Sequence, residues 1–138
     1  MKIAIRYYTK SGNTRKLAEA IGRAIGVAPE DISNPLTEDV DLLFLGSSVY
    51  KAGVDKAVKR FISDLDVKVG KIVNFSSAAL ISGTYRQVKK LAAARGIAMA
   101  DEEFHCKGSF HGLFKSHPDT VDLKNAGAFA ENVVAGGK

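Results

Sequence analysis

A short polar segment near the start of the chain combines side chains suited to binding an anion. In order, its residues are Thr9, Lys10, Ser11, Gly12, Asn13 and Thr14. The segment follows an apolar run typical of a β-strand and precedes residues with helical periodicity. Backbone N–H groups and the helix dipole bind anions at such a helix start, and a glycine lets the backbone come close to the ligand. The segment therefore predicts a phosphate-binding loop, with ordinary helix capping by Ser, Asn or Thr as the alternative.

Several known phosphate and nucleotide sites are excluded by spacing. The chain has no Gly-x-x-x-x-Gly-Lys loop and no Gly-x-Gly-x-x-Gly fingerprint. A receiver domain would need acidic residues where Tyr8 and Thr9 stand. A small phosphatase would need an arginine flanking a cysteine in one loop, and Cys106 has no such neighbour.

Two further polar segments follow apolar runs, at residues 47–53 and 76–83. Tyr50, in the first of them, offers an aromatic face on which a flat ligand could stack. Packing of Tyr50 beneath its own loop is the alternative interpretation.

Apolar runs alternate with helix-period segments along the whole chain. Strands are predicted at residues 2–9, 30–33, 41–45, 71–75 and 102–107, and helices at 13–25, 54–65, 84–95 and 118–134. Gly26 and Gly96 are placed to end the first and third helices, and Pro118 suits the first turn of the last. The alternation predicts a doubly wound α/β sandwich with a parallel sheet. Ligands of such sheets bind beyond the carboxyl ends of the strands, which brings the three polar segments together.

Composition is that of one soluble domain spanning residues 1–138. The chain is 46% hydrophobic, contains a single cysteine and has a net charge of +5. It has neither a signal-peptide pattern nor an apolar stretch long enough to cross a membrane, so we expect a cytoplasmic protein. The basic balance favours acidic partners, whereas the scattered Lys and Arg residues argue against nucleic acid.

Histidines and the cysteine gather late in the chain, as His105, Cys106, His111 and His117. Their spacing matches no closed zinc pattern, and adjacent strand residues point to opposite faces. We therefore expect no metal site, and we expect Cys106 to be a small, buried hydrophobic residue. No side chain stands out as a catalytic group.

Residues 9–14 resemble the Thr/Ser-x-Thr/Ser-Gly-Asn-Thr loop of flavodoxins, which holds the phosphate of FMN. Residues 45–50 are similar to the second flavin loop of that family, and residues 104–110 and 117–119 extend the likeness to the short-chain flavodoxins. The resemblance implies a three-layer flavodoxin-like sandwich with a five-stranded parallel sheet in the order 2-1-3-4-5. It also implies FMN as cofactor and electron transfer between redox proteins. We expect the protein to be a monomer.

The cofactor-binding residues implied by the resemblance fall in the three polar segments. They are Thr9, Lys10, Ser11, Gly12, Asn13, Thr14, Ser47, Ser48, Val49, Tyr50, Lys51, Ala52, Gly53, Ser76, Ser77, Ala78 and Ala79. Tyr50 would form a wall of the flavin ring site, and residues 76–79 would offer backbone N–H donors to the ring.

Two departures from the family pattern carry expectations of their own. The third segment has small residues where flavodoxins place an aromatic one, and Gly53 comes later than the usual glycine after the wall residue. We therefore expect a less stabilised one-electron-reduced flavin. Because Lys10 and Lys51 would favour the anionic reduced flavin, we also expect a less negative two-electron potential than in acidic flavodoxins.

Three functions remain open from the sequence. The first is an electron carrier that serves partner proteins, a reductase and an acceptor. The second is an FMN-dependent oxidoreductase acting on a small molecule such as a quinone or porphyrinogen, for which the small third segment would leave room. The third is a family member that binds phosphate or a partner without redox chemistry.

Overall fold

The computed structural model describes residues 1–10, 12–49, 54–78, 84–107 and 118–136. Within these residues five strands alternate with four helices along the chain. They are β1 Ile3–Tyr8, α1 Asn13–Ile25, β2 Pro29–Asp31, β3 Val40–Val49, α2 Lys56–Ser63, β4 Val69–Ala78, α3 Tyr85–Ala94, β5 Ala98–Lys107 and α4 Thr120–Gly136.

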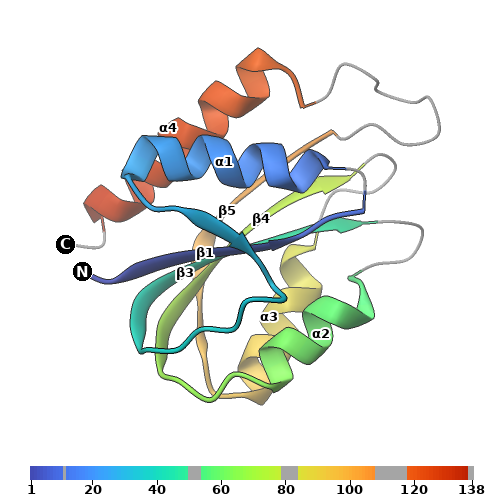
Figure 1. The fold of residues 1–138 in the computed structure, drawn as a ribbon, viewed down its shortest axis with the longest axis vertical. Coiled ribbons are helices and arrows are strands. Elements are labelled where there is room, and N and C mark those ends of the chain that lie inside the picture. Colours follow the sequence, from blue (N-terminus) through green and yellow to red (C-terminus); the bar gives the residue numbers. More distant parts are fainter. Residues whose placement is uncertain (11, 50–53, 79–83, 108–117, 137–138) are drawn as a thin grey trace.

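All five strands are parallel and form one sheet in the order β2-β1-β3-β4-β5. Helices α1 and α4 cover one face, and α2 and α3 cover the other (Figure 1). The strands are parallel because each crossover returns the chain to the same end of the sheet. Strand order differs from chain order because β2 lies on one side of β1 and β3, β4 and β5 lie on the other. The predicted three-layer sandwich with order 2-1-3-4-5 is confirmed.

The continuous apolar run of β3 reflects burial on both of its faces. Leu43 and Leu45 belong to the core under α2 and α3, while Leu42 and Phe44 belong to the core under α1 and α4. Successive strand residues point to opposite faces, so a central strand covered on both sides needs apolar residues at every position.

Gly46 makes room in the sheet for an aromatic ring. It is the register partner of Phe75 on β4, and a Cβ at Gly46 would stand 2.2 Å from the Phe75 ring. Phe75 is fully buried. A glycine is therefore required where the ring crosses the neighbouring strand.

Strands β3 and β4 are longer than their apolar runs predicted. The pairing continues past Gly46 and Phe75 through Ser47↔Ser76, Ser48↔Ser77 and Val49↔Ala78. The prediction that residues 47–49 and 76–78 lie in loops is therefore wrong. Polar side chains do not end a strand whose backbone groups still have partners on the neighbouring strands.

Helix boundaries follow the capping residues. Helix α1 has the predicted bounds and ends at Gly26, which has φ 73°. Helix α2 begins two residues later than predicted, because Asp55 is its N-cap and accepts a hydrogen bond from Ala57 N at 2.9 Å.

Helix α4 begins at Thr120, after Asp119 rather than at Pro118. Asp119 and Asp122 cap this helix reciprocally, since each accepts a 2.9 Å hydrogen bond from the backbone N–H of the other. The prediction that Pro118 occupies the first turn is therefore wrong. Among the described residues, no helix combines the length and apolarity that crossing a membrane requires.

Candidate functional site

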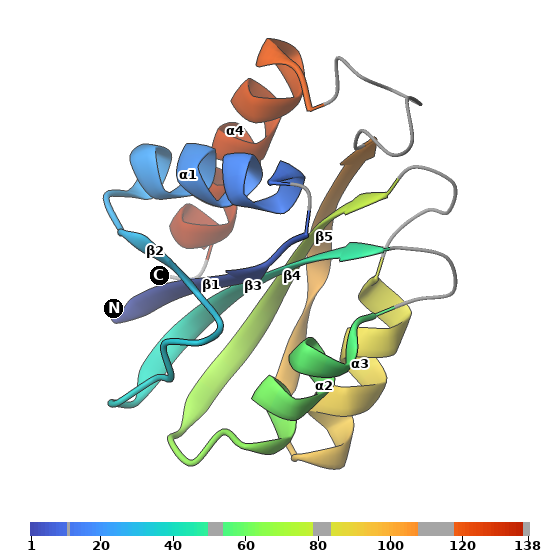
Figure 2. The ribbon, with the colours of Figure 1, turned by 45° about the vertical axis from the view of Figure 1, so that its right-hand side comes forward.

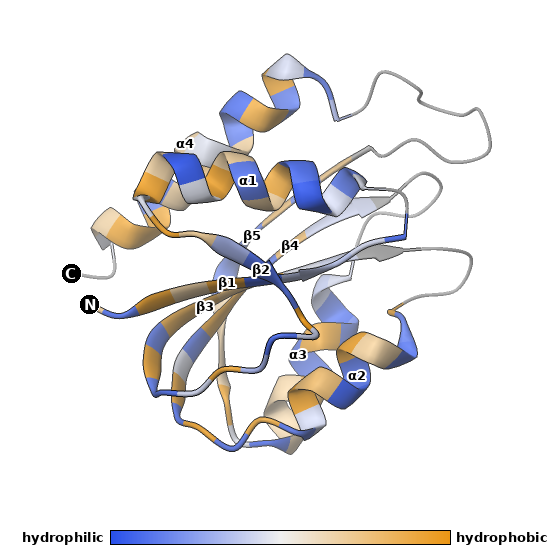
Figure 3. Ribbon diagram, viewed as in Figure 1, coloured by the Kyte–Doolittle hydropathy of each residue, from blue (hydrophilic) through white to orange (hydrophobic). Residues whose placement is uncertain are grey.

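The candidate site lies at the carboxyl ends of β1, β3 and β4, where α1 begins (Figure 2). Hydropathy falls along these strands toward that edge (Figure 3). Polar residues that are far apart in the chain meet there because parallel strands end on the same side of a sheet.

The start of α1 has the backbone of an anion site. Gly12 occupies the N-cap position with φ 90°, in the left-handed region, and carries no side chain to cap the helix. The first turn contains no acidic residue. Helix-start N–H groups lack partners within the helix and lie at the positive end of its dipole. The geometry therefore fits a phosphate.

Thr9 folds this loop back on itself. Its Oγ1 accepts a hydrogen bond from Gly12 N at 3.0 Å. Such a local bond between a side chain and the backbone favours a turn, so Thr9 helps to hold Gly12 in its left-handed conformation. Thr9 thus has a structural role in addition to the phosphate contact expected of it.

Thr14 joins the start of α1 to the end of β4. Its Oγ1 is 3.1 Å from Ser77 Oγ, in hydrogen-bond contact, and both residues are buried. Because α1 covers the sheet at this point, the bond fixes the helix start against the strand end. The structure thus brings together the first and third predicted segments.

A second buried polar network lies on the opposite face, under the start of α3. Thr84 Oγ1 accepts hydrogen bonds from Ser47 Oγ and from Asn74 Nδ2, both at 3.1 Å. Thr84 is the N-cap residue of α3, yet its side chain does not cap the helix, since its hydroxyl is used in the network. Sequence reasoning missed Asn74 and Thr84, although a single polar residue inside the apolar run of β4 was a signal for a buried partner.

Ser76 supplies an orphaned buried hydroxyl at the same edge. Its Oγ is buried and has no hydrogen-bond partner among the described residues. Ser76 lies in register between Ser47 on β3 and His105 on β5. Burying an unpaired hydroxyl is unfavourable, so this position fits a polar group of a bound ligand.

Lys10 lies beside a carboxylate rather than alone. Its Nζ is 3.5 Å from Asp55 Oδ2. The pKa of Asp55 lies below its usual value, first because Ala57 N–H donates to the carboxylate and further because Lys10 is close. The positive charge expected to favour a reduced flavin is therefore partly offset.

The remaining predicted residues lie partly in β3, β4 and α1 and partly outside the described residues. Ser48, Val49 and Ala78 lie in β3 and β4, and Asn13 is buried in the first turn of α1. Residues Ser11, Tyr50, Lys51, Ala52, Gly53 and Ala79 lie outside the described residues. The backbone donors expected of Ser76 and Ser77 lie inside β4, which is paired on both sides.

The cysteine and histidine at the end of β5 face different surroundings. Cys106 packs against the core under α1 and α4. Burial, together with nearby Asp122 and Asp119, raises the pKa of its thiol to about 12. His105 Nδ1 instead contacts Glu103 Oε1 at 2.7 Å. Within the described ranges no three His, Cys, Asp or Glu side chains are grouped as a metal site.

Known proteins are similar to this chain in sequence and in structure. No protein-family model matches the chain. An uncharacterized protein of Methanocaldococcus jannaschii is 27% identical in an alignment 136 positions long, and the match covers 88% of this chain and 90% of that protein.

Solved structures agree along nearly the whole chain. A flavodoxin from the domain Archaea has a TM-score of 0.81 at 16% identity, with 99% of both chains covered. Flavodoxin 2 from Bacillus cereus has a TM-score of 0.73 at 18% identity, again with 99% of both chains covered. The rubredoxin oxygen:oxidoreductase of Desulfovibrio gigas has a TM-score of 0.76 at 14% identity over 99% of this chain and 36% of its own. The chain therefore has the flavodoxin-like fold.

Proposed function

We propose that residues 1–138 form one domain that binds FMN non-covalently and transfers electrons between redox proteins. Bound FMN would supply one- and two-electron redox chemistry, and the protein would bind and orient it. The observation that carries the proposal is the start of α1, where Gly12 at φ 90° opens a helix whose first turn has no acidic residue. The fold of the solved flavodoxins is a second support.

Residues of the proposed site have distinct tasks. Residues 9–14 would hold the phosphate, with Thr9 shaping the loop through its bond to Gly12 N. Thr14 would position the loop through Ser77. The ends of β3 and β4, with the buried Ser76 hydroxyl, would form the floor beneath the ring. Tyr50 remains the proposed ring wall.

The test is to titrate FMN into freshly prepared apoprotein and to measure binding by the quenching of flavin fluorescence. We expect one-to-one binding of FMN and at least about 100-fold weaker binding of riboflavin, because two charge-assisted hydrogen bonds to phosphate are together worth about 3 kcal/mol. Inorganic phosphate should compete with FMN but not with riboflavin. Equal affinity for the two flavins would contradict the proposed phosphate loop.

A partner assay separates the electron carrier from a small-molecule oxidoreductase. A carrier reduced by a flavoprotein reductase should pass electrons to an acceptor protein but show no steady NAD(P)H oxidation with a quinone alone. Because the chain carries a net charge of +5, we propose that its redox partners present acidic surfaces and that transfer slows as salt is added. Steady turnover with the quinone alone would favour the oxidoreductase.

A further inference from the structure

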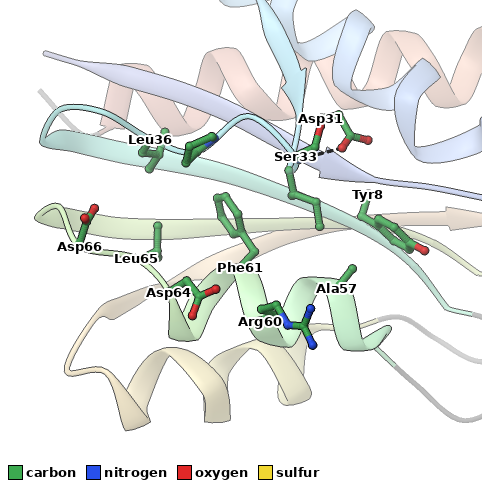
Figure 4. Close-up of a pocket in the computed structure, with 12 residues that line it drawn as sticks. Tyr8, Asp31, Ser33, Leu36, Ala57, Arg60, Phe61, Asp64, Leu65 and Asp66 are labelled. Atoms are coloured by element: carbon green, nitrogen blue, oxygen red, sulfur yellow. Dashed lines mark hydrogen bonds between the residues drawn. The ribbon is translucent and has the colours of Figure 1, made fainter.

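A groove of about 420 Å³ runs between α2 and the segment that follows β2. Figure 4 shows Phe61 of α2 between Leu36 and Asp66 at one end and Tyr8 at the other. The groove lies on the face of α2 and α3, whereas α1, whose start forms the proposed phosphate site, covers the other face. Its volume is in the range of small-molecule sites.

The groove exists because no helix in the described part of the chain covers this corner of the sheet. Strand β2 has only three residues, Pro29–Asp31, and residues 32–39 then lead into β3 without forming a helix. The floor is consequently apolar and only partly covered. Ile32 and Tyr8 are half-buried there, beside the buried Leu36 and Phe61.

The rim of the groove has a charge opposite to that of the chain as a whole. Among the described residues that line it are three carboxylates, Asp31, Asp64 and Asp66, and one guanidinium, that of Arg60. Among the described residues, Asp64 and Asp66 form no ion pair. Asp31 is held at the rim because its Oδ1 accepts a 2.8 Å hydrogen bond from Ser33 N.

We propose that this groove binds a small aromatic cation. Its flat apolar body would lie against Tyr8 and Phe61, and its ammonium or amidinium group would lie near Asp64 and Asp66. An apolar floor accommodates the ring, and the local excess of carboxylates selects the positive charge. The chain as a whole has a net charge of +5 and attracts anions. The acidic rim of the groove instead favours a cationic ligand.

The first experiment compares two probes with one ring system and opposite charges. 2-Naphthylmethylammonium and 2-naphthylacetate are titrated separately into the full chain, loaded with FMN if it binds, and followed by ligand-observed NMR. We expect the cation to bind about tenfold more tightly, as a rim excess of two negative charges in a solvent-exposed setting implies. Equal binding of both probes, or no binding of the cation, would overturn the proposal.

Variants locate the binding site without disturbing the core. Asp64→Asn and Asp66→Asn should each weaken cation binding about two- to fivefold, and Arg60→Gln should tighten it by a similar factor. Glu131→Gln, an exposed change on α4, is the matched control and should have no effect.

Filling the groove gives an independent test. Ala57 lines it from the half-buried side of α2, and leucine is a strong helix former. Ala57→Leu should abolish cation binding while the far-UV circular dichroism and FMN binding stay as in the parent chain. Unchanged cation affinity in this variant would overturn the assignment to the groove. Because neither probe requires flavin, failure here and failure of FMN binding are distinguishable.

Discussion

Thr14 Oγ1, in the first turn of α1, lies 3.1 Å from Ser77 Oγ, near the end of β4. The two residues are 63 positions apart in the chain, and both are buried. The hydroxyl pair therefore ties the proposed phosphate loop to the neighbouring part of the candidate site, so the stability of the fold and the geometry of the site are coupled at this point.

The hydroxyl pair should contribute to stability as a unit. Thr14→Val keeps the side-chain shape and removes the hydroxyl, so we expect a loss of about 1–2 kcal/mol in the free energy of unfolding. Ser77→Ala should cost a similar amount. The double variant should lose less than the sum, with a coupling energy of about 1 kcal/mol. Urea unfolding of the four proteins measures this, and additive losses would contradict a direct bond.

Gly12 and Gly26 form a matched pair of helix-end glycines. Their φ values are 90° and 73°, and a Cβ at either position meets nothing within 4 Å. Alanine should therefore destabilise the fold through backbone strain alone, by about 1–2 kcal/mol at each position. Only Gly12→Ala should also weaken FMN binding, because only Gly12 shapes the proposed phosphate loop. Thermal unfolding and flavin titration measure the two effects; equal FMN affinity in both variants would argue against that loop.

Cys106 should be an unreactive thiol in the folded protein. Because its pKa is raised from 9.0 to about 12, the thiolate fraction near pH 8 falls about 1000-fold relative to an ordinary cysteine. Labelling with a thiol-specific disulfide reagent should therefore be slow at pH 8 and fast in urea. Fast labelling without denaturant would contradict the raised pKa of this partly buried thiol.

Cys106 should also make stability depend on alkaline pH. A thiol whose pKa is higher in the folded state stabilises the fold fully below its unfolded pKa, and this contribution is lost as pH rises from 9.0 to about 12. The free energy of unfolding should therefore fall with pH over that window. Cys106→Ala is the control, and its profile should be flatter there.

Substitution of Asp55 can remove the negative charge beside the proposed phosphate loop and still keep the N-cap of α2. Asparagine is as good an N-cap as aspartate, so Asp55→Asn should leave α2 intact and remove the partner of Lys10. We expect FMN binding to tighten about two- to threefold at low salt, and the gain to vanish near 0.5 M salt. Asp55→Ala is the comparison and should lose about 1 kcal/mol of stability. An unchanged affinity of Asp55→Asn for FMN would indicate that Lys10 is too far from the phosphate to affect binding.

Acid should weaken the same cap. The pKa of Asp55 is lower in the folded protein than its usual 3.8, so its contribution is present above that value and is lost as pH falls through the lower, folded pKa. The effect is small because the Asp55 side chain is only partly buried, with 22% of its surface exposed to solvent. A slightly steeper acid loss of stability in the parent chain than in Asp55→Asn checks the sign.

Local patterns were enough to predict the elements and the class of fold. Leu17 and Ile21 lie one helical turn apart, and their side chains are completely buried in α1. The apolar run from Leu42 to Leu45 indicated a strand covered on both faces, which β3 is. Such periodicity is a property of neighbouring residues, so it can be read without knowing what lies opposite.

Contacts between distant residues were decided only by the tertiary structure. The extension of β3 and β4 through Ser47 and Ser76 depends on backbone partners in the adjacent strands. The bond between Thr14 and Ser77 depends on where α1 crosses the sheet. The groove beside Phe61 depends on a corner that no helix among the described residues covers. The sequence by itself determined which residues are apolar, polar or able to cap a helix. Strand order, register and helix placement determined which buried polar groups contact one another. Those contacts could not be predicted because they join segments that share no local pattern.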